Sequence, residues 1–190
     1  MSDKLKALYW LLRDASGKTY SSPEEAEEYN KIAVKYFERE KLAEYIAKTF
    51  QELIPCGGTV IDSAAGTGII TKALAIKGFN VVALDISPHQ LDFLKSSISG
   101  ITTTVSDINS HINCEDESVN GITQVGASRF MTVEGQELFV KEAARTLKED
   151  GIFIYPVFFG EIPSSKRRHG LKQKSFSFEI SKFIEKCGFE

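Results

Sequence analysis

Apolar and polar positions follow two different periods along the chain, and the period changes at the Gly57-Gly58 pair. Before this pair, apolar residues recur every three or four positions, which is the spacing of an amphipathic helix. Ser22, Pro23 and Glu25 supply an N-cap, a proline in the first turn and an acid three residues after the cap. The pattern predicts a short helix over residues 5–12, and then one long helix or two in tandem over residues 23–54.

After the glycine pair, short apolar runs alternate with helical segments, as in repeated strand and helix units. The predicted strands cover residues 59–62, 80–85, 102–105, 119–125 and 151–158. The predicted helices cover residues 69–77, 88–98, 134–147 and 176–187. Ser87 and Gln90 repeat the capping-box spacing at the start of the second of these helices. Because parallel strands need right-handed crossovers, this order predicts an α/β fold: a Rossmann-like, doubly wound, mostly parallel sheet with helices on both faces.

Composition and charge restrict the class of protein but indicate no specific reaction. The 190 residues suffice for one sizeable core, so we expect residues 1–54 to form a helical extension that packs on a single domain of residues 55–190. The 23 basic and 26 acidic residues give a formal net charge of −3, which does not favour nucleic acid as a partner. The absence of a signal-peptide pattern and of a long apolar stretch predicts a cytoplasmic protein without a membrane partner. The cysteines and histidines show no metal-ligand spacing, so no metal is expected.

The segment from Val60 to Ile70 carries the clearest chemical signal. An acid closes a buried strand, small residues follow, and a Gly-x-Gly turn opens a helix. Glycine permits unusual φ angles and lets a ligand lie against the backbone, while the N–H groups of the helix start face that ligand. Ligands of open α/β sheets bind outside the carboxyl ends of the strands. We therefore predict that a cofactor is held here by Asp62, Ser63, Ala64, Gly66, Thr67 and Gly68.

Acids also follow the next two predicted strands. Asp85 ends the second strand, where a carboxylate can accept hydrogen bonds from both hydroxyls of a ribose. Its alternative role is that of an acid near the start of the following helix. Ser106 and Asp107 follow the third strand, where the edge of an adenine would lie between Ile86 and Ile108. Asp107 can also be a plain turn residue.

A dinucleotide site is the main competing interpretation of this pattern. A Gly-x-Gly turn after a strand, with an acid about 20 residues further on, is also the fingerprint of NAD-binding proteins. Thr71 stands where that fingerprint has its third glycine, and the Asp62 carboxylate would repel a pyrophosphate. The negative charge of Asp62 would instead be compatible with a cofactor that carries an ammonium and a sulfonium. An NAD-type oxidoreductase therefore remains the less favoured alternative.

The three motifs together resemble those of the class I S-adenosylmethionine-dependent methyltransferases. The resemblance rests on Asp62-x-x-x-Gly66-x-Gly68, on Asp85 and on Ser106-Asp107, and it extends over roughly residues 29–190. It implies S-adenosylmethionine as the cofactor, with its methionine part at the glycine turn, its ribose on the strand-two acid and its adenine beside the strand-three acid. It also implies that Gln124 and Tyr29 contribute to this site. For Tyr29, packing of an amphipathic helix is the competing interpretation.

The resemblance further implies a methyltransferase that acts on a small-molecule acceptor. Methyl transfer from a sulfonium is an in-line displacement, so the protein mainly has to align donor and acceptor. The chain reads Gln124-Val125-Gly126-Ala127 after the fourth strand, without the Asp-Pro-Pro-Tyr-like motif of base-methylating DNA enzymes. The catalytic residues are unassigned. The candidates for a general base are Glu134, His111 and His169.

A non-catalytic methyltransferase-like binding or scaffold protein is the alternative from a different class. Asn120 stands where many relatives have an aspartate at the start of strand four. The chain also stops at Glu190, where relatives enter strand six, so strands six and seven are expected to be missing. A sheet that ends at strand five would leave an apolar edge around Ile152, through which the protein could self-associate.

Overall fold

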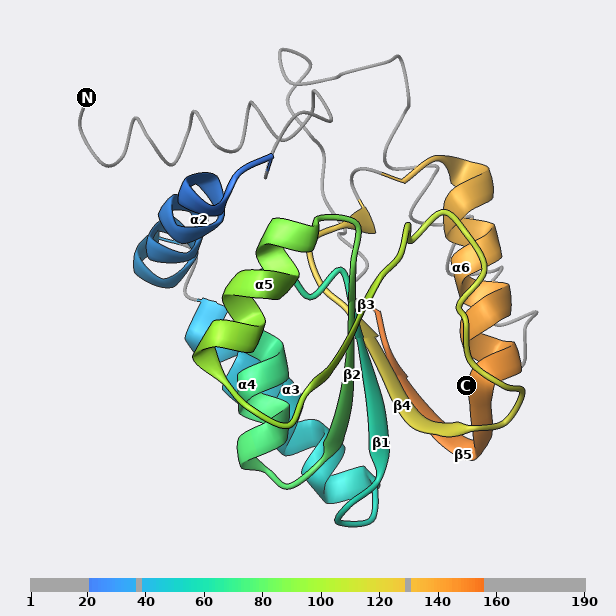
Figure 1. Cartoon of the computed structure of the whole chain (residues 1–190). Coiled ribbons are helices and arrows are strands. Elements are labelled where there is room, and N and C mark those ends of the chain that lie inside the picture. The colour runs from blue at the N-terminus through green and yellow to red at the C-terminus, as the bar shows by residue number, and fades with distance from the viewer. Residues whose placement is uncertain (1–20, 37–38, 129–130, 156–190) are drawn as a thin grey trace.

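A five-stranded parallel sheet forms the centre of the protein (Figure 1). The computed structural model describes residues 21–36, 39–128 and 131–155. The strands are β1 (Thr59–Ser63), β2 (Asn80–Asp85), β3 (Thr102–Val105), β4 (Val119–Gln124) and β5 (Leu147–Ile154). Their order in the sheet is β3-β2-β1-β4-β5, and every pair of neighbours is parallel. The predicted Rossmann-like sheet is confirmed.

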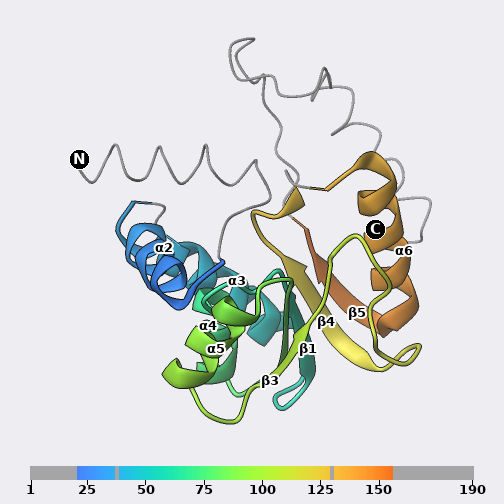
Figure 2. The ribbon, with the colours of Figure 1, turned by 45° about the horizontal axis from the view of Figure 1, so that its top comes forward.

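Helices cover both faces of this sheet, as the doubly wound prediction requires. The described helices are α2 (Pro23–Tyr36), α3 (Arg39–Leu53), α4 (Ile69–Ile76), α5 (Pro88–Ser97) and α6 (Val133–Thr146). The helices α3, α4 and α5 lie on one face and α6 lies on the other (Figure 2). Helix α2 packs against α5 and α3. The predicted tandem helices before the sheet are thus α2 and α3.

The alternation of side chains along each strand decides which helix it meets. In β1, Val60 belongs to the core cluster beneath α3 and α4, whereas Ile61 faces Phe139 of α6. In β4, Ile122 joins Ile61 on the α6 face. Helices cover both faces of the central strands, so consecutive residues such as Val60 and Ile61 are both apolar and buried, whereas the buried residues that end β1, Asp62 and Ser63, are polar.

Helix α3 contributes its own apolar side chains to this core. Ile46, Phe50 and the following Ile54 are buried in one cluster with residues of β1, β2 and α4. Gly121 of β4 lies directly beneath them, because a Cβ at this position would stand only 2.7 Å from Phe50 Cε1. Burial of each such large side chain stabilises the fold by about 1.5–3 kcal/mol. The division of the chain at residue 54 stays a prediction.

The start of β5 differs from the sequence prediction. We expected a helix to residue 147 and a strand from Gly151, but the strand begins at Leu147. Leu147 pairs with Val119, whereas Ile152 pairs with Gly121, so the chain between Leu147 and Ile152 bulges out of the ladder. Asp150 in this bulge has a φ of 62°. A bulge breaks the regular pattern of side chains, so the periodicity of the sequence did not reveal the first part of the strand.

Some predicted elements cannot be compared with the structure. The predicted helices over residues 5–12 and 176–187, the last part of the predicted strand over residues 151–158, and the expected loss of strands six and seven lie outside the described residues. Within the described ranges, no helix has the length and apolar character that crossing a bilayer requires.

Candidate functional site

The turn between β1 and α4 has the backbone geometry that the glycine pattern predicts. Gly66 and Gly68 have φ angles of 57° and 82°, and Gly68 is the N-cap of α4. A Cβ at Gly68 would lie 2.1 Å from Leu94 Cδ1, so any other residue there would force the buried Leu94 side chain to move. At Gly66 the nearest such atom is Gln90 Oε1, at 3.8 Å from the place of a Cβ. The turn is therefore closed on the Gly68 side and open beside Gly66.

Small residues prepare this turn at the end of β1. Ser63 is buried, and Ala64 adopts a φ of 58°, which is uncommon for a residue with a side chain. The Ala65 N–H donates to the carbonyl of Leu84 in β2 at 2.9 Å, and so fixes the turn to the neighbouring strand. The backbone at the predicted site is thus held in one conformation by the sheet.

Asp62 lies one residue earlier and is buried. One carboxylate oxygen accepts a hydrogen bond of 2.6 Å from the hydroxyl of Thr71 on α4. Burial raises the pKa of Asp62 to about 7, although hydrogen bonds from Thr71 act in the opposite direction. Thr71, which stands where the NAD fingerprint has its third glycine, therefore serves as the hydrogen-bond partner of Asp62.

Asp85 joins the end of β2 to the glycine turn. One of its carboxylate oxygens accepts from the Gly66 N–H at 2.8 Å, and the other accepts from the Ser87 N–H at 2.9 Å. Burial raises the pKa of Asp85, and these two N–H groups counteract the rise. Two of the predicted cofactor residues are thus in direct contact, although they lie far apart in the sequence.

Helix α2 is also connected to the turn. The Thr67 hydroxyl donates a hydrogen bond of 2.8 Å to the side-chain oxygen of Asn30. Tyr29, the predicted contributor on this helix, is half-buried. The structure brings its neighbour Asn30 to the glycine turn, and the amphipathic pattern alone could not distinguish the two residues.

The residues after β3 lie at the same edge of the sheet. The Ser106 N–H donates to the Asp85 carbonyl at 2.9 Å. Asp107 is exposed, and one of its oxygens accepts from both the backbone and the side chain of Asn109, which is the turn geometry that we considered as an alternative. Ile86 is 64% exposed, whereas Ile108 packs against the core on the α6 face.

A small set of buried polar atoms marks this edge of the sheet. Within the described part of the chain, the buried side-chain polar atoms that lack a hydrogen-bond partner are Gln90 Nε2, Gln90 Oε1, Thr123 Oγ1 and Gln124 Oε1. Thr123 and Gln124 end β4, in register with Asp62 and Ser63 of β1. Such unpaired groups are rare in folded proteins and call for an explanation. Of these three residues, sequence analysis named only Gln124 as a site residue.

Gln90 was not predicted as a site residue because its position in the sequence predicts a helix cap. The sequence predicts a capping box in which the glutamine side chain returns to the backbone of Ser87. The first half of this motif is present, since the Ser87 hydroxyl accepts from the Gln90 N–H at 3.4 Å. The second half is wrong, because the Gln90 side chain has no hydrogen-bond partner among the described residues.

The candidate bases do not gather at the glycine turn. His111 contacts Glu142 at 2.6 Å, near the carboxyl end of α6. Glu134 is an exposed residue in the first turn of α6, and His169 lies outside the described residues. The described residues contain no cluster of three or more ligands that could hold a metal ion. No general base is assigned.

His111 and Glu142 belong to a set of contacts that we call the Arg145 clamp. Arg145 donates to Glu142, to Asp116 and to the carbonyls of Ile112 and Cys114. The Ile112 N–H donates to the same Glu142 carboxylate at 3.0 Å. The clamp holds the loop before β4 against α6.

Asn120 also lies at the start of β4. Its side-chain oxygen accepts from the Thr59 N–H at 3.1 Å and from Lys148 Nζ at 3.3 Å. It therefore joins the beginnings of β1, β4 and β5, at the opposite end of the sheet from the glycine turn. The absence of an aspartate at this position consequently does not argue against a functional site.

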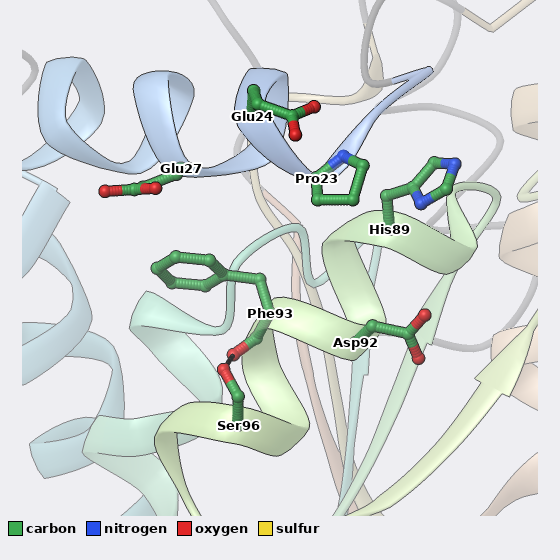
Figure 3. A pocket seen from close by; sticks show the side chains of 7 residues that line it. All are labelled: Pro23, Glu24, Glu27, His89, Asp92, Phe93 and Ser96. Atoms are coloured by element: carbon green, nitrogen blue, oxygen red, sulfur yellow. Dashed lines mark hydrogen bonds between the residues drawn. The ribbon is translucent and has the colours of Figure 1, made fainter.

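A separate groove of about 420 Å³ runs between α2 and α5 (Figure 3). It is lined by Pro23, Glu24, Glu27, His89, Asp92, Phe93 and Ser96. None of the predicted cofactor residues lines this groove. Two of its acids are in ion pairs on their own helices, Glu27 with Lys31 and Asp92 with Lys95. The groove is therefore not the candidate site.

Comparison with known proteins agrees with this geometry. Residues 60–151 match the model of the methyltransferase domain family. Comparison with curated proteins gives no match.

Similar folds occur among solved structures of methyltransferases. A TehB-like S-adenosylmethionine-dependent methyltransferase from Corynebacterium glutamicum is 21% identical, with a TM-score of 0.63 over 87% of this chain and 84% of its own. An S-adenosylmethionine-dependent methyltransferase from Clostridium acetobutylicum is 23% identical, with a TM-score of 0.58 over 68% and 56%. The S-adenosylmethionine-bound amino pentose methyltransferase from Micromonospora echinaspora is 17% identical, with a TM-score of 0.54 over 62% and 50%.

Proposed function

Because residues 60–151 match the methyltransferase domain family, we propose that this chain is a class I S-adenosylmethionine-dependent methyltransferase that methylates a small-molecule acceptor. When bound, S-adenosylmethionine would supply a methyl group on a sulfonium: the acceptor nucleophile would bond to the methyl carbon while the bond from carbon to sulfur breaks, and S-adenosylhomocysteine would leave. The task of the chain is then to hold the cofactor, to align the acceptor and to exclude water, because the leaving group is already activated.

The contact between Gly66 and Asp85 is the observation that carries this proposal. It joins the open side of the glycine turn to a carboxylate at the end of β2. The Asp85 carboxylate accepts the N–H groups of Gly66 and Ser87, and the backbone N–H of Ile86 also acts on it. A carboxylate has about four lone-pair sites, so capacity remains for a hydroxyl of a ribose. The orphaned atoms of Thr123 and Gln124 lie at the same edge of the sheet. The residues present therefore fit the cofactor.

We assign the parts of the cofactor to the residues at this edge. The methionine part lies at the glycine turn, the ribose at the end of β2 and the adenine beside the loop after β3. For the methionine part, the proposed contacts are Asp62, Ser63, Ala64, Gly66, Thr67, Gly68 and Tyr29. For the ribose, the proposed contact is Asp85. For the adenine, the proposed contacts are Ile86, Ser106, Asp107 and Ile108. Gln124 borders the site from the end of β4. The exposed apolar side chain of Ile86 supports a stacking role, since ligand sites often leave such surface uncovered.

The proposed class of acceptor, a small molecule, rests on the net charge and on the sequence after β4. The formal net charge of −3 provides no general attraction for a polyanion, and the sequence after β4 lacks the motif of base-methylating DNA enzymes. The test uses S-adenosylmethionine with a labelled methyl group and a cell extract separated into small-molecule, protein and nucleic-acid fractions. We expect the label in the small-molecule fraction. Label in protein or nucleic acid would contradict this acceptor class.

Cofactor binding is tested by calorimetric titration of the full chain with S-adenosylmethionine. We expect the wild-type protein to bind and Gly66→Val to lose binding, because the added side chain occupies the open side of the turn and resists the φ of 57°. Gly100→Val is the matched control. Gly100 has a φ of 79°, but a Cβ there would meet no atom within 4 Å.

The control separates loss of the site from backbone strain. Gly100→Val should lose stability through strain but retain cofactor affinity. If Gly66→Val binds as well as the wild-type protein, the cofactor does not lie against this turn. Binding of a nicotinamide dinucleotide in place of S-adenosylmethionine would favour the oxidoreductase alternative.

A further inference from the structure

We propose that Gln90 determines cofactor specificity: its side-chain amide makes hydrogen bonds with the ribose hydroxyls that the Asp85 carboxylate faces. This inference rests on the proposed function, because it adds a contact to the same cofactor site. The glutamine lies on α5, outside the motifs that sequence analysis assigned to the cofactor.

The first observation is that the Gln90 amide is buried without a partner. The residue is 1% exposed, and neither Nε2 nor Oε1 has a hydrogen-bond partner among the described residues. Leaving both ends of a buried amide unpaired destabilises a fold. Because both atoms are unpaired, the conclusion is the same whichever way the amide is turned.

The second observation is the position of this amide. Gln90 Oε1 is the nearest atom to the open side of Gly66, at 3.8 Å from the place of a Cβ. The Gln90 N–H is bonded to the Ser87 hydroxyl, and the Ser87 N–H is bonded to Asp85. The first turn of α5 therefore holds Gln90, Asp85 and the glycine turn in a fixed arrangement.

The chemistry of the two side chains is complementary toward a pair of hydroxyls. An ionised carboxylate only accepts hydrogen bonds, so Asp85 can use the hydroxyl protons of a ribose but leaves the hydroxyl oxygens without a donor. The Gln90 amide offers a donor at Nε2 and an acceptor at Oε1. Together the two side chains can satisfy both roles of both hydroxyls.

Another buried glutamine shows what a structural role looks like in this protein. Gln136 of α6 is 3% exposed, and its Oε1 accepts from the Tyr155 hydroxyl at 2.8 Å. Its Nε2 donates to the Ser128 carbonyl at 2.9 Å. The Gln136 amide is fully paired within the fold, whereas that of Gln90 is not. This contrast supplies the control for the experiment.

The experiment compares Gln90→Met with Gln136→Met in the full chain. Methionine keeps the length of the side chain and removes the amide. We expect Gln90→Met to raise Tm by about 2–4 °C, because an unpaired polar group has gone. Its affinity for S-adenosylhomocysteine, measured by calorimetry, should fall about 10-fold. Gln136→Met should lower Tm and leave this affinity unchanged.

Ribose recognition is tested with the 2′-deoxy and 3′-deoxy analogues of S-adenosylhomocysteine. For the wild-type protein, at least one analogue should bind about 10-fold more weakly than the parent compound. For Gln90→Met this difference should be smaller, because the amide that reads the hydroxyl is absent. A purely structural role of Gln90 would leave the difference unchanged.

The outcomes separate this inference from the proposed function. If the wild-type protein does not bind S-adenosylhomocysteine, both are overturned. If the wild-type protein binds and Gln90→Met binds equally well, only the inference is overturned. A Gln90→Met protein with a lower Tm would show that the amide has a partner within the fold, and would also contradict the inference.

Discussion

The two ends of the sheet bury their acidic side chains in opposite ways. At the carboxyl end, Asp62 and Asp85 accept hydrogen bonds only from neutral groups, and no salt bridge to either is found among the described residues. Burial raises the pKa of both carboxyls. At the other end, burial also acts to raise the pKa of Glu142, but hydrogen bonds from Arg145 and the Ile112 N–H, together with the charges of Arg145 and His111, lower that pKa overall.

This difference indicates that the Arg145 clamp serves the stability of the fold, whereas the carboxyl end of the sheet is suited to binding. In the Arg145 clamp the polar groups satisfy one another, so the clamp holds the fold together without a ligand. At the carboxyl end, the acids and the orphaned amides have hydrogen-bonding capacity that the fold itself does not use. Functional sites commonly retain such unfavourable groups, because they are satisfied only when the ligand binds.

Arg145→Met should lower the free energy of unfolding by about 2–4 kcal/mol, because it leaves Glu142 and two backbone carbonyls without their charged donor. Chemical denaturation measures this loss. The cofactor affinity of the folded protein should not change. Asp116→Asn is the control, since the Asp116 side chain is 74% exposed and its ion pair should contribute less than about 1 kcal/mol. Equal losses in the two variants would contradict the central role of Arg145.

Asp85→Ala should weaken S-adenosylmethionine binding by about 10- to 150-fold, which corresponds to charged hydrogen bonds worth about 1.5–3 kcal/mol. Asp107→Ala should have a smaller effect, because that side chain is exposed and already bonded to Asn109. Calorimetry on both folded variants decides the matter. A larger effect of Asp107→Ala would reverse the assignment of ribose and adenine.

The pH dependence of stability should have opposite signs at the two ends. The pKa of Asp62 is about 7 in the folded protein and about 3.8 in the unfolded chain, so between these values only the folded state holds the proton. Asp62 therefore makes stability fall by about 1.4 kcal/mol per pH unit as pH rises toward 7. Asp62→Asn should remove this slope in denaturation curves. An unchanged slope would mean that Asp62 is ionised in the fold.

Glu142 provides the opposite case. Its pKa is lowered in the folded protein, so its contribution is present above the ordinary glutamate pKa and is lost as pH falls through the folded value. The contributions of the two ends of the sheet to stability thus depend on pH with opposite signs.

The sequence predicted the order of the elements because local signals agreed with one another. Ser87 and Pro88 mark the start of α5, and the Gly-x-Gly turn marks the start of α4. The bulge at the start of β5 could not be predicted, because pairing between strands, not local pattern, determines it. The candidate site could be proposed from the sequence where it follows from strand ends, as for Asp62 and Asp85.

Gln90 was missed for a physical reason. A polar residue in the first turn of a helix normally serves the helix, and only the three-dimensional packing shows that this one does not. On α2, the sequence favoured Tyr29 over its neighbour Asn30, because the contact of Asn30 with Thr67 depends on how α2 packs. Motifs therefore indicated the candidate site, whereas tertiary contacts add the side chains that we propose complete it.

Ala64 has a consequence for the kinetics of ligand capture. With a φ of 58°, it occupies a conformation that glycine adopts freely and alanine does not. Alanine is strained in this conformation, so the turn keeps it only because the rest of the fold holds it, through contacts such as the 2.9 Å hydrogen bond from the Ala65 N–H to the Leu84 carbonyl. A turn held in this way has little conformational entropy left to lose when a cofactor binds, and association need not wait for a rearrangement.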